Sequence, residues 1–381
     1  MGLFEKDPAC IAQREFVNIP AWQQYSGKGL CIFCDDIEEN HVSKIADIIQ
    51  TILPEATIYT GWIEFTKDER YITGCHINCL ETGERLPFDA FILKYQVKLI
   101  NNSTTGGGGE VIQPESEFTA YKMINYHLIF CGAAGNVSRG AMSSRFYGSA
   151  IMVSSVDLVR GEAVYGNRSI GDIDFVMFHG WDSGTSFSSP FMLAMIGLII
   201  SRYGDMFQVE VYQYLQMISL DLGDPGYDSY FGNGIPILPD LNRRYLSLVI
   251  GSRDMRVDGR TVVLEAAPTI AKRRTAYVPL SVFSLGLGAQ VSWDADHTVV
   301  RISKGKFEIS LSVGGSGASA GRSGAAEFGR SGTPIFRAIL NKEGLPLVPV
   351  RAVAEALNCK VDFVKVEKRV MILAGSTELV R

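Results

Sequence analysis

Short apolar runs alternate with amphipathic helical patterns through the first 220 residues, and this alternation constrains the fold most strongly. Residues 29–34 (GLCIFC) form an apolar run that is typical of a strand buried on both faces. Residues 41–53 follow with apolar side chains at helical spacing. Further strand-like runs lie at 56–59, 90–93, 97–100, 127–131 and 150–153. This order predicts an α/β domain with a mainly parallel sheet flanked by helices.

The segment 180–199, GWDSGTSFSSPFMLAMIGLI, places small polar residues before a proline and a long apolar run. Pro190 is typical of a first helical turn, where its missing N–H costs no hydrogen bond. The run 191–200 is too short to span a bilayer, so it predicts a core helix. Ser186 would then lie at the N-terminus of this helix, beside free backbone N–H groups and the positive end of the helix dipole.

Polar residues of four kinds stand where strands end or helices begin. In parallel sheets, functional side chains gather at the carboxyl ends of the strands. Asp35 directly follows the first strand, His41 opens the first helix, and Asn136 follows the strand at 127–131. A serine nucleophile needs a base, a carboxylate that orients the base, and an oxyanion donor. Together with Ser186, these residues supply the types that acyl transfer requires.

The same motifs resemble those of the subtilisin-like serine proteases, the subtilase family. SGTSFSSP (183–190) resembles the nucleophile motif, and HVSKIADII (41–49) resembles the histidine motif. CGAAGN (131–136) is similar to the strand that ends at the oxyanion asparagine. VKLINNSTTGG (97–107) is similar to the substrate-binding edge strand. The resemblance covers about residues 17–236, and the motifs occur in the family's order.

This resemblance implies a serine endopeptidase that hydrolyses polypeptides through an acyl-enzyme, without a cofactor. Asp35 would orient and stabilise the imidazolium of His41, which transfers the proton of Ser186. Asn136 would donate a hydrogen bond to the tetrahedral oxyanion. Asp36 is a rival for the carboxylate, but the family's catalytic aspartate ends its strand directly, which favours Asp35. The substrate-binding residues implied are Ser103, Thr104, Thr105, Gly106, Ala134 and Gly135.

Several departures from the family pattern bear on activity. Only residues 36–40 separate Asp35 from His41, and Phe178-His179-Gly180 stands in place of Ala-Pro-Gly. These changes favour an alternative, a weak or inactive subtilase-like domain used as a scaffold or binding protein. A third possibility is a regulatory or self-processing protease that cleaves only itself or one partner. Thr105 replaces a glycine of the substrate edge, which predicts a narrow pocket. The alternative is that the glycine run 106–109 shifts the register by one residue and leaves a glycine at that position. The shortened loops argue against the family's calcium sites.

Two other groups of residues, a cysteine pair and a second histidine, could suggest chemistry but have simpler explanations. Cys75 and Cys79 alternate with residue 77 as on one face of a strand, and no second ligand pair follows them, so we expect no metal site. His179 lies close to Ser186 in sequence and is a weaker alternative base.

The C-terminal third contains an internal repeat. Residues 276–302 and 346–372 align at a constant offset of 70, with identical pairs such as Val278/Val348. Each copy predicts a strand, a short helix and a hairpin. The copies extend over about 246–303 and 309–373, with a Gly/Ser-rich stretch at 314–332. The repeat resembles the copper amine oxidase N-terminal-like module, which implies no copper here but a role in adhesion, assembly, or docking to a partner or to the catalytic domain.

Charge divides the chain near the same point. Residues 1–250 carry a net charge of −12 and residues 251–381 carry +7. We therefore predict a catalytic domain over 1–245 and a duplicated accessory module over 246–381. An acidic chain without a basic stripe is a poor candidate for binding nucleic acid, and no run reaches the length of a membrane helix.

The cysteines and the N-terminus bear on localisation. The seven cysteines are an odd set at apolar positions, so we expect free, buried thiols and a reducing compartment. The N-terminus shows no signal peptide, so a cytoplasmic location is expected. Secretion is the alternative if a leader was removed.

Overall fold

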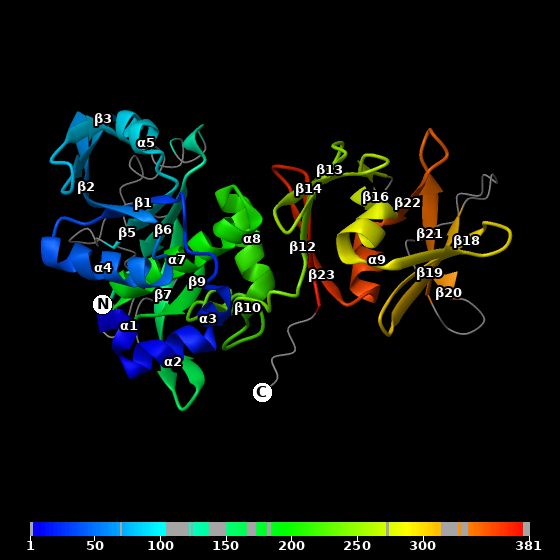
Figure 1. The fold of residues 1–381 in the computed structure, drawn as a ribbon, viewed down its shortest axis with the longest axis horizontal. Helices are drawn as coiled ribbons and strands as arrows, with labels where there is room; N and C mark the ends of the chain where they lie inside the picture. The colour runs from blue at the N-terminus through cyan, green and yellow to red at the C-terminus, as the bar shows by residue number, and fades with distance from the viewer. Residues whose placement is uncertain are drawn as a thin grey trace. The chain divides into compact units, whose positions relative to one another are not determined.

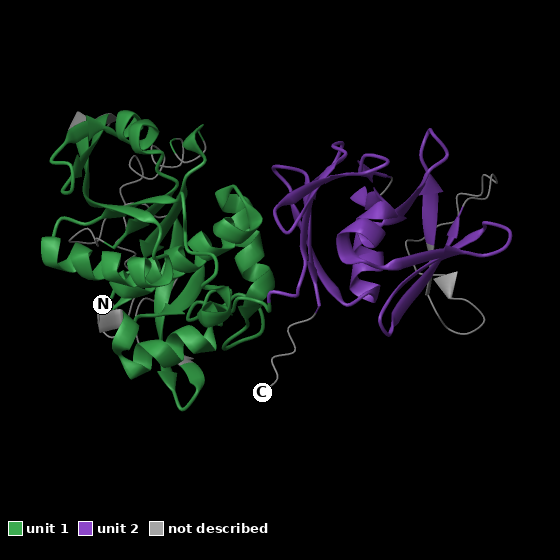
Figure 2. Cartoon of the chain, in the orientation of Figure 1, with its two compact units in different colours: residues 1–240 green, residues 241–381 purple. Residues whose placement is uncertain are grey.

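The fold is described from a computed structural model, in which the chain forms two compact units, residues 1–240 and 241–381 (Figure 2). The division lies close to the boundary at 245/246 that the sequence predicts. The structure describes residues 3–68, 71–103, 122, 125–136, 150–165, 173–180, 184–271, 274–313, 327–328 and 334–375.

The N-terminal unit is built on a sheet of mostly parallel strands, which confirms the predicted α/β class (Figure 1). The parallel strands lie in the order β2, β1, β5, β6, β7 and β9. Antiparallel strands β3, β4 and β8 extend the sheet. The bounds are β1 Cys31–Asp35, β2 Thr57–Asp68, β3 Tyr71–Cys79, β4 Arg85–Pro87, β5 Leu99–Asn102, β6 Ile129–Ala133, β7 Ile151–Val159, β8 Glu162–Tyr165 and β9 Phe175–Phe178, with a separate pair β10 Ser219–Leu220 and β11 Ile235–Pro236.

Helices surround this sheet, and the most buried of them is α7. It is the one described helix that is long and apolar enough to cross a membrane, but 89% of that stretch is buried inside the unit. The predicted core helix is therefore confirmed. At Gly197 a Cβ atom would come within 2.3 Å of Leu53 Cδ1, because the end of α4 packs closely on α7. The bounds are α1 Leu3–Lys6, α2 Pro8–Phe16, α3 Ile19–Trp22, α4 Glu39–Ile52, α5 Phe88–Tyr95, α7 Thr185–Tyr203 and α8 Gln208–Ile218.

Two local predictions are wrong, and the strand predicted at 56–59 is too short. Residues 90–93 belong to α5, because a short apolar run does not by itself distinguish a buried helix from a strand. β2 continues far beyond residue 59 and forms a hairpin with β3. Pro190 lies inside α7, which begins at Thr185, so the proline does not mark the first turn.

In the C-terminal unit, each sheet combines strands from both of the copies that the sequence predicts. β12, β13 and β14 of the first copy join β23 and β24 of the second copy. In the other sheet, β17 pairs with β18 of the first copy, and β18 pairs with β19 of the second copy. In this same sheet, β16 and β22 pair antiparallel, with Val278 opposite Val348. Because these two valines are equivalent at the offset of 70, the pairing places the two copies symmetrically about this point.

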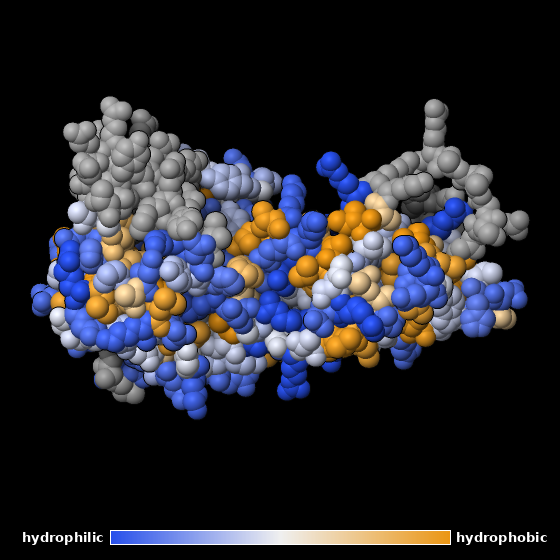
Figure 3. All heavy atoms as spheres, turned by 90° about the horizontal axis from the view of Figure 1, so that it is seen from above, coloured by the Kyte–Doolittle hydropathy of each residue, from blue (hydrophilic) through white to orange (hydrophobic). Residues whose placement is uncertain are grey.

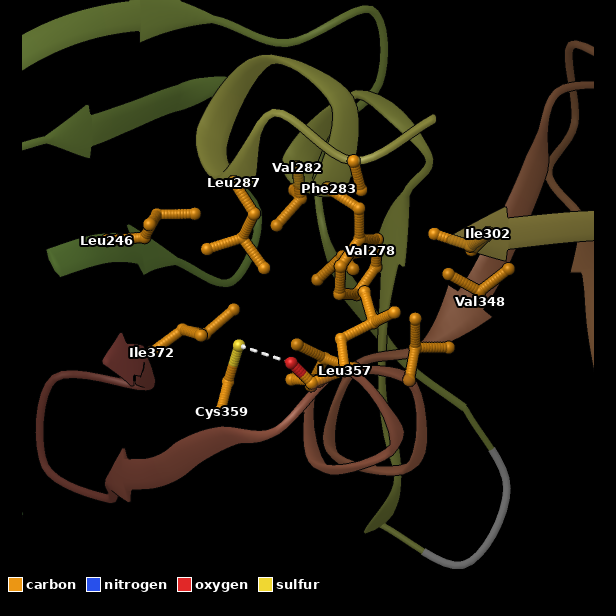
Figure 4. Packing of buried hydrophobic residues seen from close by; sticks show 14 of the residues in the cluster. Leu246, Val278, Val282, Phe283, Leu287, Ile302, Val348, Leu357, Cys359 and Ile372 are labelled. Carbon is orange, nitrogen blue, oxygen red and sulfur yellow. Dashed lines mark hydrogen bonds between the residues drawn. The ribbon is translucent and has the colours of Figure 1, made fainter. Parts of the chain in front are cut away.

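One apolar core lies between the strands and helices of both copies (Figure 4). Ile302 and Ile372 occupy equivalent positions in the two copies and both point into this cluster. Cys359 Sγ donates to the backbone oxygen of Leu357 within it, at 3.7 Å. The bounds are β12 Tyr245–Val249, β13 Asp254–Val257, β14 Arg260–Val263, β15 Thr269–Ile270, β16 Ala276–Pro279, η2 Val282–Gly286, β17 Gln290–Trp293, β18 Val299–Lys304, β19 Phe307–Val313, β20 Glu327–Phe328, β21 Pro334–Leu340, β22 Pro346–Pro349, α9 Val350–Ala356, β23 Cys359–Val364 and β24 Arg369–Ala374.

Exposed apolar side chains belong to separate elements of the described chain. On the face shown in Figure 3, polar residues surround smaller apolar areas. Among the most exposed apolar residues, Val366 lies between β23 and β24, and Ile37 lies between β1 and α4. Apolar residues that are exposed singly are common on protein surfaces, so they do not by themselves identify a binding surface.

Candidate active site

The carboxylate that contacts His41 is Asp36. Its Oδ2 lies 2.6 Å from His41 Nδ1, and the Asp36 side chain is only 3% exposed. Its Oδ1 accepts the backbone N–H of Glu38 at 2.9 Å, which shapes the short loop into α4. This tight turn brings the first residues of the helix back over the end of β1, so five residues suffice to reach His41.

The assignment of Asp35 as the partner of His41 is therefore corrected. Asp35 ends β1 and is fully buried, and its oxygens accept the backbone N–H of Ile63 at 2.7 Å and Asn102 Nδ2 at 2.6 Å. Successive residues of an extended chain point in opposite directions. Asp35 thus reaches β2 and β5 within the sheet, while Asp36, one residue later, reaches α4.

His41 is held between a carboxylate and an aromatic ring. The hydrogen bond that His41 donates to Asp36 raises the pKa of His41, and burial of the imidazole opposes this shift. The ring also meets Phe187 edge-on, with centroids 5.3 Å apart. Since Phe187 directly follows Ser186, His41 lies at the start of α7, with its imidazole 25% exposed.

Ser186 is anchored to the end of β5 through Ser103. Ser186 Oγ donates to the backbone oxygen of Ser103 at 3.2 Å. In return, Ser103 Oγ donates to the backbone oxygen of Ser186 at 2.7 Å. In a regular helix that oxygen would accept the N–H of residue 190, but Pro190 has no N–H. The proline inside α7 thus leaves an acceptor that the Ser103 hydroxyl occupies.

Asn136 lies over the turn that leads into α7. Its Oδ1 accepts the backbone N–H of Thr185 at 2.9 Å, so its NH₂ group is the donor that the amide offers, and the residue is exposed. Gly184 has a φ of 131°, and a Cβ atom there would lie 3.3 Å from both Oδ1 and Nδ2 of Asn136. Only glycine combines this backbone conformation with such a close approach.

The structure brings Asp36, His41, Ser186 and Asn136 to one edge of the sheet, but it does not join all of them. Between the described side chains of Ser186 and His41 there is no hydrogen bond, because the serine hydroxyl is directed to Ser103. Hydrogen bonds between catalytic groups are often long in unliganded enzymes and shorten when substrate binds.

The expected substrate-binding residues are placed in part. Ser103 contacts Ser186 as described, and Ala134 is buried with its N–H on the backbone oxygen of Val153. Gly135 donates its N–H to Thr185 Oγ1 at 3.0 Å. Thr104, Thr105 and Gly106 lie outside the described residues.

Two further contacts in the N-terminal unit carry no signal in the local sequence. His179 Nε2 lies 2.6 Å from Asp157 Oδ1, forming a second histidine–carboxylate pair after β9. The adjacent Gly180 exchanges hydrogen bonds with the buried side chain of Gln13 in α2. These partners are 22 and 167 residues apart in sequence, so only the fold brings them together.

The cysteines do not add chemistry to the site. All seven are free and buried. Burial raises the pKa of Cys10 and of Cys31 to about 12, so these thiols remain protonated at neutral pH. Cys75 and Cys79 lie on β3 with their side chains buried, as the alternation predicts. Within the described residues, no group of three or more His, Cys, Asp or Glu side chains could hold a metal ion.

Comparison with solved structures gives subtilisin-like proteases. Fervidolysin from Fervidobacterium pennivorans, a keratinolytic enzyme related to subtilisin, is 13% identical with a TM-score of 0.44, and the match covers 67% of this chain and 54% of fervidolysin. A lanthipeptide protease is 15% identical with a TM-score of 0.42, over 61% and 94% of the two chains. MycP1 from Mycobacterium smegmatis is 13% identical with a TM-score of 0.42, over 63% and 87%.

Comparison with protein families matches the copper amine oxidase N-terminal domain at residues 238–302 and 256–324. No curated protein matches the chain. The chain spans about half the length of fervidolysin, so the activity of that whole enzyme does not transfer to it. The chain resembles subtilisin-like serine proteases in structure, and residues 238–302 and 256–324 are similar to the copper amine oxidase N-terminal domain.

Proposed function

We propose that the N-terminal unit is a serine endopeptidase that hydrolyses peptide bonds through an acyl-enzyme. The contact between His41 Nδ1 and the buried carboxylate of Asp36 carries this proposal. Such a contact fixes the tautomer of a neutral imidazole, with the proton on Nδ1 and the lone pair on Nε2. His41 is thereby prepared to accept a proton at Nε2.

We assign one residue of the site to each step of the reaction. Ser186 Oγ attacks the carbonyl carbon of the peptide while its proton passes to His41 Nε2. Asp36 stabilises the imidazolium that forms. The Asn136 NH₂ group and the backbone at the start of α7 stabilise the negative oxygen of the tetrahedral intermediate. His41 then gives its proton to the leaving amine, and a water molecule repeats the sequence on the acyl-enzyme.

One rearrangement is required before attack. Ser186 Oγ donates to the backbone oxygen of Ser103 at 3.2 Å, which is a long hydrogen bond between neutral groups. A rotation about the Cα–Cβ bond of Ser186 releases this bond and turns the hydroxyl toward the imidazole. Because such a bond contributes only about 0.5–1.5 kcal/mol, the rotation is not a prohibitive step.

The same observation supports a second candidate function. A serine whose hydroxyl is bound to its own scaffold fits a protein that retains the protease fold to bind a polypeptide without cleaving it. The direct test is treatment with a fluorophosphonate, which forms a covalent adduct with an activated serine. Intact mass should show one adduct on the wild type and none on Ser186→Ala; an unmodified wild type would favour the binding scaffold.

A further inference from the structure

Asn101 and Ser103, at the end of β5, connect the sheet to the first turns of α7. Ser189 Oγ donates to Asn101 Oδ1 at 2.7 Å, and Asn101 Nδ2 donates to Ser103 Oγ at 2.8 Å. Ser103 in turn bonds both the backbone oxygen and the hydroxyl of Ser186. All these side chains are buried. The position of the serine therefore depends on the position of the Asn101–Ser103 segment.

Asn102, in the middle of this segment, is held by Asp35. Its Nδ2 donates to Asp35 Oδ2 at 2.6 Å, while Asp35 Oδ1 accepts the backbone N–H of Ile63 at 2.7 Å. One fully buried carboxylate thus joins the end of β1 to both neighbouring strands. Burying a charge is costly unless it is well bonded, so a carboxylate here is not a neutral choice of core residue.

We propose that Asp35 is a positioning residue for the nucleophile, acting through Asn102 and Ser103 on Ser186. This inference rests on the proposed protease function. The adjacent carboxylates then have separate tasks: Asp36 orients the base, and Asp35 fixes the strand end that carries the contacts to the serine. Asp35 touches neither substrate nor His41 in this role, so it alters the geometry of attack without altering the basicity of the imidazole.

The chemistry of the Asp35 site distinguishes a carboxylate from an amide. A carboxylate offers two acceptors, one for the Ile63 N–H and one for Asn102 Nδ2. In Asp35→Asn one acceptor becomes an NH₂ group, which faces the NH₂ group of Asn102. The reciprocal double variant Asp35→Asn/Asn102→Asp restores a donor opposite an acceptor and retains an acceptor for Ile63.

The test measures the rate of fluorophosphonate labelling of Ser186 against pH. For Asp35→Asn we expect the plateau rate to fall about tenfold, because misplacement by a fraction of an ångström is costly in catalysis. The midpoint of the profile should not move. The double variant should recover at least part of the rate. Asp157→Asn is the matched control, since it removes a carboxylate with an equally short contact to a histidine, and its labelling rate should equal that of the wild type.

Amide hydrogen exchange provides a readout that does not depend on activity. Asp35→Asn should speed exchange in segments 99–103 and 184–189, and the double variant should restore protection. Wild-type labelling rate in Asp35→Asn, or unchanged exchange in both segments, would overturn the proposal. A shifted midpoint would also overturn it, by showing that Asp35 acts on His41. If Asp35→Asn does not fold, the double variant decides: a folded double variant whose plateau labelling rate stays about tenfold or more below that of the wild type contradicts the proposal. A wild type that takes no label refutes the protease function, while exchange still tests the placement.

Discussion

Gly184→Ala should impair both the stability and the chemistry of the N-terminal unit. Gly184 adopts φ 131° and ψ 154°, a backbone conformation that residues with a side chain rarely occupy. Residues held in such regions cost about 1–3 kcal/mol each. The added methyl group would also lie 3.3 Å from both terminal atoms of the Asn136 amide, so that amide must shift by a few tenths of an ångström.

The magnitude follows from these two effects. A loss of about 1–3 kcal/mol lowers Tm by roughly 2–4 °C per kcal/mol for a unit of this size. Displacing the Asn136 amide lengthens its bond to Thr185 and moves the proposed oxyanion donor. Removing such a donor entirely costs about 10²–10³ in kcat, so a partial displacement should slow fluorophosphonate labelling about tenfold.

A matched control separates backbone strain from the contact with Asn136. Gly83 has φ 67° and nothing within 4 Å of an added Cβ atom. Gly83→Ala should therefore cost about 1 kcal/mol in stability and leave labelling unchanged. Thermal unfolding and labelling rates on the three proteins measure both quantities. Labelling of Gly184→Ala at the wild-type rate would refute the placement of Asn136 as the donor.

Four other outcomes are expected. Labelling should rise with pH through the raised pKa of His41, and Asp36→Asn should move the midpoint of this profile to lower pH. The charged His41–Asp36 pair stabilises the fold below the ordinary histidine pKa, and this stabilisation is lost as pH rises through the raised pKa. In thermal unfolding, the loss of stability caused by Asp36→Asn should therefore shrink over that pH range. Asn136→Ala should lower kcat by about 10²-fold with a smaller change in KM, measured on a peptide substrate. Iodoacetamide should modify none of the seven cysteines in the native protein, by intact mass, and all of them after unfolding. Residues 1–240 alone should label at the full-length rate, since every proposed site residue lies in that unit; a folded truncation without label would contradict this.

Much of the fold follows from local sequence patterns. The runs that become β1, β6 and β7 are apolar enough to be recognised as strands buried on both faces. Residues 90–93 fail the same test, because apolar character is shared by strands and buried helices. The outer part of the β2–β3 hairpin is missed for a different reason: its polar residues, with Glu64 and Thr66 exposed, break the apolar pattern.

The site is predictable in its residue types but not in its contacts. His41, Ser186 and Asn136 are identifiable from their motifs, and the structure gathers them at one edge of the sheet. The choice between Asp35 and Asp36 fails, because it depends on which face of β1 each side chain leaves from. A shift of one residue in the strand reverses that direction, and the sequence of two adjacent aspartates does not fix it.

Pro190 shows why a residue can be misread when its partner is distant. A proline in a helix ordinarily lies in the first turn, since elsewhere it removes a hydrogen bond. Here the vacated acceptor is the carbonyl oxygen of the proposed nucleophile, and Ser103 binds it from 83 residues away. A regular helix would have satisfied that oxygen internally and left Ser186 tied to β5 by its hydroxyl alone, the bond that attack must break. The proline thus allows the backbone of Ser186 to stay attached to the sheet when its hydroxyl releases Ser103, as the proposed mechanism requires.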